Sequence, residues 1–229
     1  MSMDQRTKRQ PTTPHLRDVR ISVGSATLEG VWCVPAGGVG IVLFAHGSGS
    51  SRHSPRNQAV ARALQESGTG KLLFDLLTRE EEAADARTGH LRFDIGLLAQ
   101  RLVAATRWVA HQPEGERLGL GYFGSSTGGA AALVAAAELG SVVDAVVSRG
   151  GRPDLADDAL SRVDAPTLLI VGELDDVVLQ LNEAAYEALR CEKELAVVPG
   201  ATHLFEEPGA LEEVARLAAA WFRRHLKPR

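Results

Sequence analysis

Two adjacent serines stand among glycines in the stretch GYFGSSTGG, residues 121–129. Gly124 to Gly128 match the pattern G-x-S-x-G, in which Ser126 is the central residue and Ser125 occupies a variable position. An apolar run precedes the motif and a helical pattern of small residues follows it, which predicts a sharp strand-to-helix turn at Ser126. A serine raised on such a turn can attack a carbonyl carbon. The alternative is a turn that caps a helix and has no chemistry.

Serine attack requires a base that takes the hydroxyl proton and an acid that orients this base. Two histidines, His203 and His225, follow Ser126 along the chain. We select His203, because it lies in VVPGATHLFEEP just beyond a predicted strand, where an imidazole can reach the edge of a sheet. Its alternative is a surface histidine of a loop. His225 is expected in the solvated end of a C-terminal helix, beside basic residues.

The acid that orients His203 is expected in the stretch LLIVGELDDVV, where three carboxylates follow an apolar strand. The carboxyl end of this strand would bring Glu173, Asp175 and Asp176 to the height of the imidazole. We assign the role to Asp175, whereas Asp176 is placed to cap a helix that begins near Val178. The predicted triad therefore joins Asp175 and His203 to the serine of the G-x-S-x-G motif.

The negative charge that develops on a substrate carbonyl oxygen needs preorganised N–H donors. Thr127, the residue after the nucleophile, is expected to supply one of them. The second is assigned to the backbone of Ser48 in HGSGSSR, residues 46–52, because this loop closes a buried strand. His46 is expected to be structural and to hydrogen-bond within the loop.

Two arginines, Arg149 and Arg152, directly follow the predicted strand after the serine motif. This position is again the carboxyl edge of the sheet, and a guanidinium group binds a carboxylate through two parallel hydrogen bonds. Either residue would bind the anionic group of an ester or lactone. The alternative is an ion pair with Asp154 or Asp157.

Other charged groups have weaker links to a site. Arg52 and Arg56, near the predicted oxyanion loop, form a second candidate pair for an anionic substrate. The acidic run REEEAADAR, residues 79–87, either edges the pocket or forms a solvated loop or short helix. The chain between the sixth and seventh predicted strands is short, which disfavours a bulky lid and favours small, soluble substrates.

Apolar patterns predict the elements that would hold these residues. Two short alternating strands within residues 17–35 precede the continuous apolar run VGIVLFAHG, typical of a strand buried on both faces. Strands and amphipathic helices then alternate up to a final helix from Gly209. We expect an α/β fold with a mostly parallel sheet of about eight strands, helices on both faces and no large cap domain. Residues 1–14 are expected to form a flexible arm and residues 15–229 a single domain.

Composition excludes several classes of function. The 229 residues include 25 basic and 29 acidic side chains, with a net charge of −4 and no dense basic block, so we expect neither nucleic acid nor a membrane as partner. The two cysteines, Cys33 and Cys191, lie far apart, and we expect no signal peptide in a sequence that has no long apolar segment. We therefore expect a cytoplasmic protein with a small-molecule substrate.

The motifs HGSG, GSSTG, GELD and GATH, taken together, resemble the α/β-hydrolase superfamily over the chain from about residue 17 onwards. Short loops, compact length and the lack of a long insertion between Asp144 and Pro166 are similar to the dienelactone hydrolase-like family, whose members are small cytoplasmic enzymes acting on esters and lactones. The namesake enzymes use a cysteine nucleophile, whereas the matching position here is Ser126.

The resemblance implies a serine hydrolase that cleaves small soluble carboxylic esters or lactones through an acyl-enzyme, without a metal or organic cofactor. Ser126 would attack, His203 would shuttle the proton and Asp175 would orient the imidazole. The spacing of Asp175 from Gly172 and Val178 is similar to that in related enzymes. The same triad also serves thioesterases, peptidases, C–C bond hydrolases and acyltransferases, and the fold can serve as a small-ligand receptor.

Overall fold

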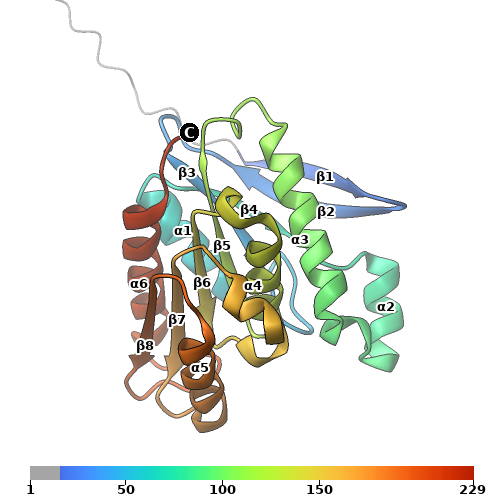
Figure 1. The fold of residues 1–229 in the computed structure, drawn as a ribbon. Coiled ribbons are helices and arrows are strands. Elements are labelled where there is room, and N and C mark those ends of the chain that lie inside the picture. Colours follow the sequence, from blue (N-terminus) through green and yellow to red (C-terminus); the bar gives the residue numbers. More distant parts are fainter. Residues whose placement is uncertain (1–15) are drawn as a thin grey trace, which may run out of the picture.

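A computed structural model describes residues 16–229 of the protein. Its strands are β1 (Arg17–Val23), β2 (Ala26–Cys33), β3 (Gly40–Ala45), β4 (Gly70–Phe74), β5 (Gly119–Ser125), β6 (Ala145–Arg149), β7 (Thr167–Gly172) and β8 (Lys193–Val198). They form one sheet in the order β1-β2-β4-β3-β5-β6-β7-β8 (Figure 1). β2 pairs antiparallel with both β1 and β4, and all other pairs are parallel. The predicted fold class is confirmed.

Helices cover both faces of this sheet (Figure 1). One face carries α1 (Pro55–Glu66) and α6 (Ala210–His225), which lie side by side. The other carries α3 (Ile95–Ala110), α4 (Thr127–Leu139) and α5 (Asp176–Ala188). The remaining helix, α2 (Arg79–Thr88), follows β4, and three short 3-10 segments complete the set: η1 (Leu91–Phe93), η2 (Gly140–Val142) and η3 (Pro153–Arg162).

Each face of the sheet buries its own apolar core. On β5, Tyr122 packs into the core beneath α3 and α4, and the next residue, Phe123, packs into the core beneath α1 and α6. Successive side chains of a strand point to opposite faces, so a strand covered on both sides buries every residue. β3, β5, β6 and β7 are buried throughout. This explains why these strands are continuous apolar runs in the sequence.

Two helices next to the predicted oxyanion loop begin at well-defined caps. The Ser54 side chain accepts a hydrogen bond from the Asn57 N–H, and Pro55 occupies the first position of α1. At α2, the Thr78 hydroxyl accepts from the Glu81 N–H, and the Glu81 carboxylate accepts from the Thr78 N–H. The acidic run 79–87 is therefore an ordered short helix, and it also edges a cavity, since Glu82 and Asp85 line one.

Two other helical segments differ from expectation. Where the alternation of strands and helices predicts a helix between β6 and β7, the structure has the 3-10 segment η3, which is interrupted at Asp157, where φ is 45°. The helix expected to begin near Val178 begins earlier, at Asp176, because Asp175 is the last residue with non-helical backbone angles. Asp176 is thus the first helical residue and not a cap.

The expectation that His225 is solvated is wrong. It is the last residue of α6 and is only 9% exposed. Its ring lies 4.4 Å from the Trp221 ring, centroid to centroid, and burial lowers the pKa of His225. α6 packs along its whole length against the sheet, so even its final turn keeps an inward face.

The predicted arm, residues 1–14, lies outside the described residues. Within residues 16–229, no helix combines the length and the apolar character that crossing a bilayer requires.

Candidate active site

The strand-to-helix turn at Ser126 has the strained geometry that the sequence predicts. Ser126 connects β5 to α4 with φ 51° and ψ −123°, a conformation that costs a non-glycine residue about 1–3 kcal/mol. The flanking glycines permit it. A Cβ at Gly124 would lie 2.5 Å from the Gly128 carbonyl oxygen, and a Cβ at Gly128 would overlap the Ala45 carbonyl.

Asp175 and His203 form a hydrogen-bonded pair. The distance between His203 Nδ1 and Asp175 Oδ2 is 2.6 Å. The loops after β7 and β8 carry these residues and are themselves joined, because the Leu174 N–H donates to the Ala201 carbonyl over 2.9 Å. Asp175 is largely buried and the His203 side chain is 39% exposed. A carboxylate on Nδ1 fixes the tautomer that leaves Nε2 free to accept a proton.

The other two acids of this loop make different contacts. Glu173 accepts a hydrogen bond from the Gly200 N–H over 2.7 Å, and Asp176 is exposed at the start of α5. Of the three carboxylates that the sequence offered, Asp175 is the one that contacts His203.

His203 and Ser126 meet the same end of β6. The Ser126 N–H donates to the Arg149 carbonyl over 3.4 Å. The next residue, Gly150, lies against His203, since a Cβ at Gly150 would lie 3.5 Å from both Nδ1 and Cε1 of the ring. Gly150 has φ 49° and leaves the space in which the imidazole packs. Three loops that are distant in sequence thus converge beside Ser126.

The loop after β3 lies against the nucleophile turn. A Cβ at Gly47 would lie 2.9 Å from Ser126 Cβ, and the Ser48 and Thr127 hydroxyl oxygens are 3.2 Å apart. Thr127 is the first residue of α4, so its N–H has no acceptor within the helix. The backbone N–H groups of Ser48 and Thr127 donate to no other residue within 16–229. Both are available to a developing oxyanion.

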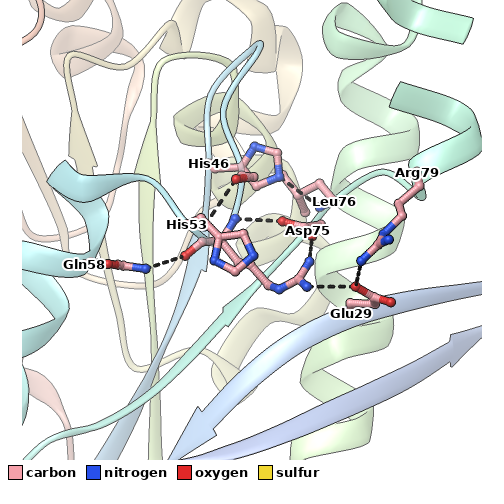
Figure 2. A network of polar contacts seen from close by, with 9 residues as sticks. Glu29, His46, His53, Gln58, Asp75, Leu76 and Arg79 are labelled. Carbon is pink, nitrogen blue, oxygen red and sulfur yellow. Dashed lines mark hydrogen bonds and ion pairs between the residues drawn. The ribbon is translucent and has the colours of Figure 1, made fainter. Parts of the chain in front are cut away.

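A charged network anchors this oxyanion loop to two neighbouring strands (Figure 2). Asp75, at the end of β4, accepts hydrogen bonds from the backbone N–H of Arg52, over 2.7 Å, and from its guanidinium. A second guanidinium nitrogen of Arg52 contacts Glu29 on β2 at 2.7 Å, and exposed Arg79 contacts the same carboxylate. Arg52 therefore binds protein carboxylates and is not free for a substrate.

His46 is part of the same anchor (Figure 2). Its Nε2 accepts a hydrogen bond from the Leu76 N–H over 3.0 Å, so the proton of the neutral ring lies on Nδ1, which donates to the Gly47 carbonyl. Burial lowers the pKa of His46, which keeps the ring neutral. The hydrogen bond to Gly47 agrees with the predicted structural role.

A cavity of about 310 Å³ adjoins the oxyanion loop. Residues 46–51 and Thr127 form one wall, and Leu76, Leu77 and Leu98 supply apolar surface. The remaining wall comes from α2, where Glu82 lines the cavity and Asp85 pairs with Arg92 at 2.5 Å. Burial and the charge of Asp75 raise the pKa of Glu82. Sequence reasoning did not identify Glu82 or Asp75 individually, although Asp75 ends an apolar strand, as other site residues do.

The two candidate substrate arginines are placed differently. Arg152 forms two parallel hydrogen bonds with Asp154, at 2.9 and 2.7 Å, which is the ion pair left open as the alternative. Arg149 is 7% exposed and has no carboxylate partner within residues 16–229. Neither is among the residues that line the cavity. Arg56, of the weaker pair, binds Glu206 at 3.0 Å.

Both cysteines, Cys33 and Cys191, are free thiols. Among the residues that the structure describes, no three His, Cys, Asp or Glu side chains gather in the manner of metal ligands.

Comparison with known proteins places this geometry in a family. Residues 30–226 match the model of the dienelactone hydrolase family. The chain belongs to this family. It therefore has the α/β-hydrolase fold, as the sequence motifs indicated.

Solved structures agree with this assignment. The chain is 60% identical to a dienelactone hydrolase from Anabaena variabilis, with a TM-score of 0.92 over 93% of this chain and 99% of that one. Est1E from Butyrivibrio proteoclasticus has a TM-score of 0.76 over 90% of this chain and 98% of that one. At 15% identity, this second likeness shows the fold alone.

Curated relatives include proteins from two strains of Mycobacterium tuberculosis, each named "Putative phosphoribosyl transferase". Each is 57% identical to this chain over 215 residues, which cover 93% of the chain. The chain spans about half (48%) of the length of these relatives. Their name thus describes proteins about twice as long as the region that matches.

Proposed function

We propose that the protein hydrolyses small carboxylic esters or lactones through an acyl-enzyme on Ser126. The observation that carries the proposal is the 2.6 Å hydrogen bond between Asp175 and His203, formed at the strand end that also contacts Ser126. Membership of the dienelactone hydrolase family supports hydrolysis, and the triad order of Ser126, Asp175 and His203 matches that of the fold.

In the proposed reaction, Ser126 Oγ attacks the carbonyl carbon and His203 Nε2 takes the hydroxyl proton. Asp175 stabilises the imidazolium that forms. The N–H groups of Thr127 and Ser48 donate to the tetrahedral oxyanion. The C–O bond then breaks, and His203 returns its proton to the leaving alcohol. Water, deprotonated by the same imidazole, hydrolyses the acyl-enzyme and restores the Ser126 hydroxyl.

The cavity next to the oxyanion loop indicates the size and polarity of the substrate. About 310 Å³ is at the lower end of the range for small-molecule sites. Its acidic wall includes Glu82, while Arg92 is already paired with Asp85, so the cavity favours a neutral ester that offers a hydroxyl group over an anionic one. A carboxylate-bearing substrate remains a narrower proposal that depends on Arg149 or Arg152.

Active-site labelling tests the nucleophile. A fluorophosphonate probe is expected to modify the wild-type protein at Ser126, as mapped by peptide mass spectrometry, and to leave Ser126→Ala unlabelled. Ser125→Ala is the matched control, because it removes the neighbouring hydroxyl of the same motif. Labelling that persists in Ser126→Ala would exclude the proposed nucleophile.

A panel of substrates tests the reaction class. We expect turnover of short-chain neutral esters and lactones by the wild-type protein and its loss in Ser126→Ala. For the narrower proposal, kcat/KM for a carboxylate-bearing ester should fall more than that for a neutral ester in Arg149→Ala or Arg152→Ala. An equal loss for both esters would reject a role of these arginines in substrate selection.

A further inference from the structure

Arg149 lies behind the serine motif, on the face of the sheet opposite α4. It ends β6, two residues after Val147, which packs in the core beneath α1 and α6, so the Arg149 side chain lies on that same face. Its guanidinium carbon lies 5.7 Å from the centre of the Phe205 ring. Phe205 follows His203 by two residues. Through this contact with Phe205, Arg149 therefore supports the loop that carries His203, the candidate base.

The guanidinium of Arg149 has no counter-ion among the described residues. Its Nε and Nη1 atoms are fully buried and donate no hydrogen bond. Burial and the nearby charge of Arg56 lower the pKa of Arg149 to about 10, with no carboxylate acting in the opposite direction. The group is nevertheless protonated at neutral pH. Buried arginines are normally paired, as Arg101 is with Glu81 at 2.7 Å, because an isolated buried charge is costly.

Other hydrogen-bond donors and positive charges on the same face of the sheet would attract an anion. Arg56 lies in the first turn of α1, where the helix dipole is positive, and its buried Nε also lacks a hydrogen-bond partner. Ser125 is the Cα partner of Arg149 across the β5–β6 pairing, and its side chain lies on the face of Phe123, towards α1. Glu206 contacts Arg56 only at the outer Nη1.

We propose that Arg149, with Arg56 and the Ser125 hydroxyl, binds a small oxyanion at the end of β6. The ligand is of the phosphate or carboxylate class, which accepts several N–H and O–H hydrogen bonds at once. It is either a free inorganic anion or the anionic group of a larger ligand. The site is distinct from the cavity beside the oxyanion loop, since none of its three residues lines that cavity. By holding the guanidinium beneath Phe205, the anion steadies the loop that carries His203.

Thermal unfolding in the presence of inorganic phosphate tests this site. At constant ionic strength, the Tm of the wild-type protein should rise saturably, by about 2–4 °C once phosphate exceeds its Kd roughly five-fold. Arg149→Met should abolish the rise. Arg152→Met is the matched control and should keep it, because Arg152 is already paired with Asp154. Equal responses in wild type and Arg149→Met would overturn the proposal.

Arg56→Gln provides a second variant in case Arg149→Met does not fold, since Arg56 is partly exposed. It should weaken phosphate binding by about tenfold, the loss expected for one charge-assisted hydrogen bond. Unchanged phosphate affinity in Arg56→Gln, measured by calorimetry, would also contradict the proposed site.

Kinetics distinguish the two sources of the anion. If the site takes the anionic group of a substrate, phosphate should compete with a phosphate- or carboxylate-bearing ester but not with a neutral ester. If the site takes a free anion, phosphate should raise Tm without competing with either ester. The binding measurements are repeated on Ser126→Ala, where phosphate binding should persist, so that failure of the proposed catalysis and failure of the anion site give different results.

Discussion

Arg52 and Arg149 lie on opposite sides of the central strand β5 and have opposite surroundings. Arg52 reaches towards β4 and β2, where Asp75 and Glu29 bind its guanidinium. Arg149 ends β6, where its guanidinium packs against the Phe205 ring and is close enough to Arg56 to be repelled by its charge. Burial acts to lower the pKa of both arginines, but the two carboxylates reverse this for Arg52 and raise its pKa.

The difference shows how one residue type serves two purposes at the same edge of a sheet. The ion pairs of Arg52 with Asp75 and Glu29 fix the oxyanion loop to two strands, so this arginine needs no ligand to balance its charge (Figure 2). In our proposal, a bound anion supplies the counter-ion that Arg149 lacks within the protein. A buried ion pair is broken at high cost, whereas removal of an unpaired buried charge is not expected to be costly.

The largest expected effect concerns His203, which lies on the loop that Arg149 contacts through Phe205. Asp175→Asn should lower kcat for ester hydrolysis by about 10⁴-fold, because the amide no longer holds the His203 tautomer that accepts the serine proton. Asp176→Asn is the matched control and should stay close to wild type. Steady-state kinetics on one ester give both values, and the reverse ranking would move the acid by one residue.

On the oxyanion side, Asp75→Asn should destabilise the fold by about 3 kcal/mol, because Arg52 is left as a largely buried cation without its main partner. The free energy of unfolding, measured in urea, checks this value. Glu29→Gln should cost less, since Glu29 is more exposed than Asp75. A smaller loss for Asp75→Asn than for Glu29→Gln would contradict the role of Asp75 as the anchor.

Arg149→Met should change the free energy of unfolding by less than about 1 kcal/mol in buffer free of phosphate and carboxylates. The lost contact with Phe205 is offset by removal of a buried charge that has no partner. The same urea titration measures it. If Arg149→Met lowered the free energy of unfolding as much as Asp75→Asn does, Arg149 would be as well paired as Arg52, and the contrast between the two arginines would be wrong.

The last prediction concerns a pH dependence from His46. Its folded-state pKa lies below that of the unfolded chain, so the unfolded state binds more protons below about pH 6.5. Stability is therefore lost as pH falls through this window, by at most about 1.4 kcal/mol per pH unit. His46→Gln should reduce the loss between pH 6.5 and pH 5.5, relative to exposed His53→Gln as the control. Identical slopes of Tm against pH in the two variants would contradict this assignment.

Local patterns predicted much of the fold and the candidate site. The strained turn at Ser126 follows from two glycines and a strand-to-helix junction, all within a few residues of one another. Asp175 and His203 follow from the rule that loops at the carboxyl ends of parallel strands share one edge. Arg152 was ambiguous between substrate and Asp154, because a two-residue separation allows an ion pair but does not require one.

Other features depended on packing between distant segments. The Arg52 network joins three segments: β2, the end of β4 and the loop that follows β3. It forms because β4 lies between β2 and β3 in the sheet. The burial of His225 depends on α6 packing against the sheet up to its last turn. The basic residues beside His225 in the sequence indicated a solvated end instead. The position of α2 beside the cavity is likewise a property of the folded chain.

The sequence by itself determined the order of strands and helices, the turn that exposes Ser126 and the loops that carry its partners, because these depend on periodicity and on backbone freedom at particular glycines. Only the tertiary structure decided which charges are paired. Arg52 and Arg149 have the same side chain, but a counter-ion for either must come from another strand or loop, and the order of strands in the sheet sets whether a carboxylate lies within reach.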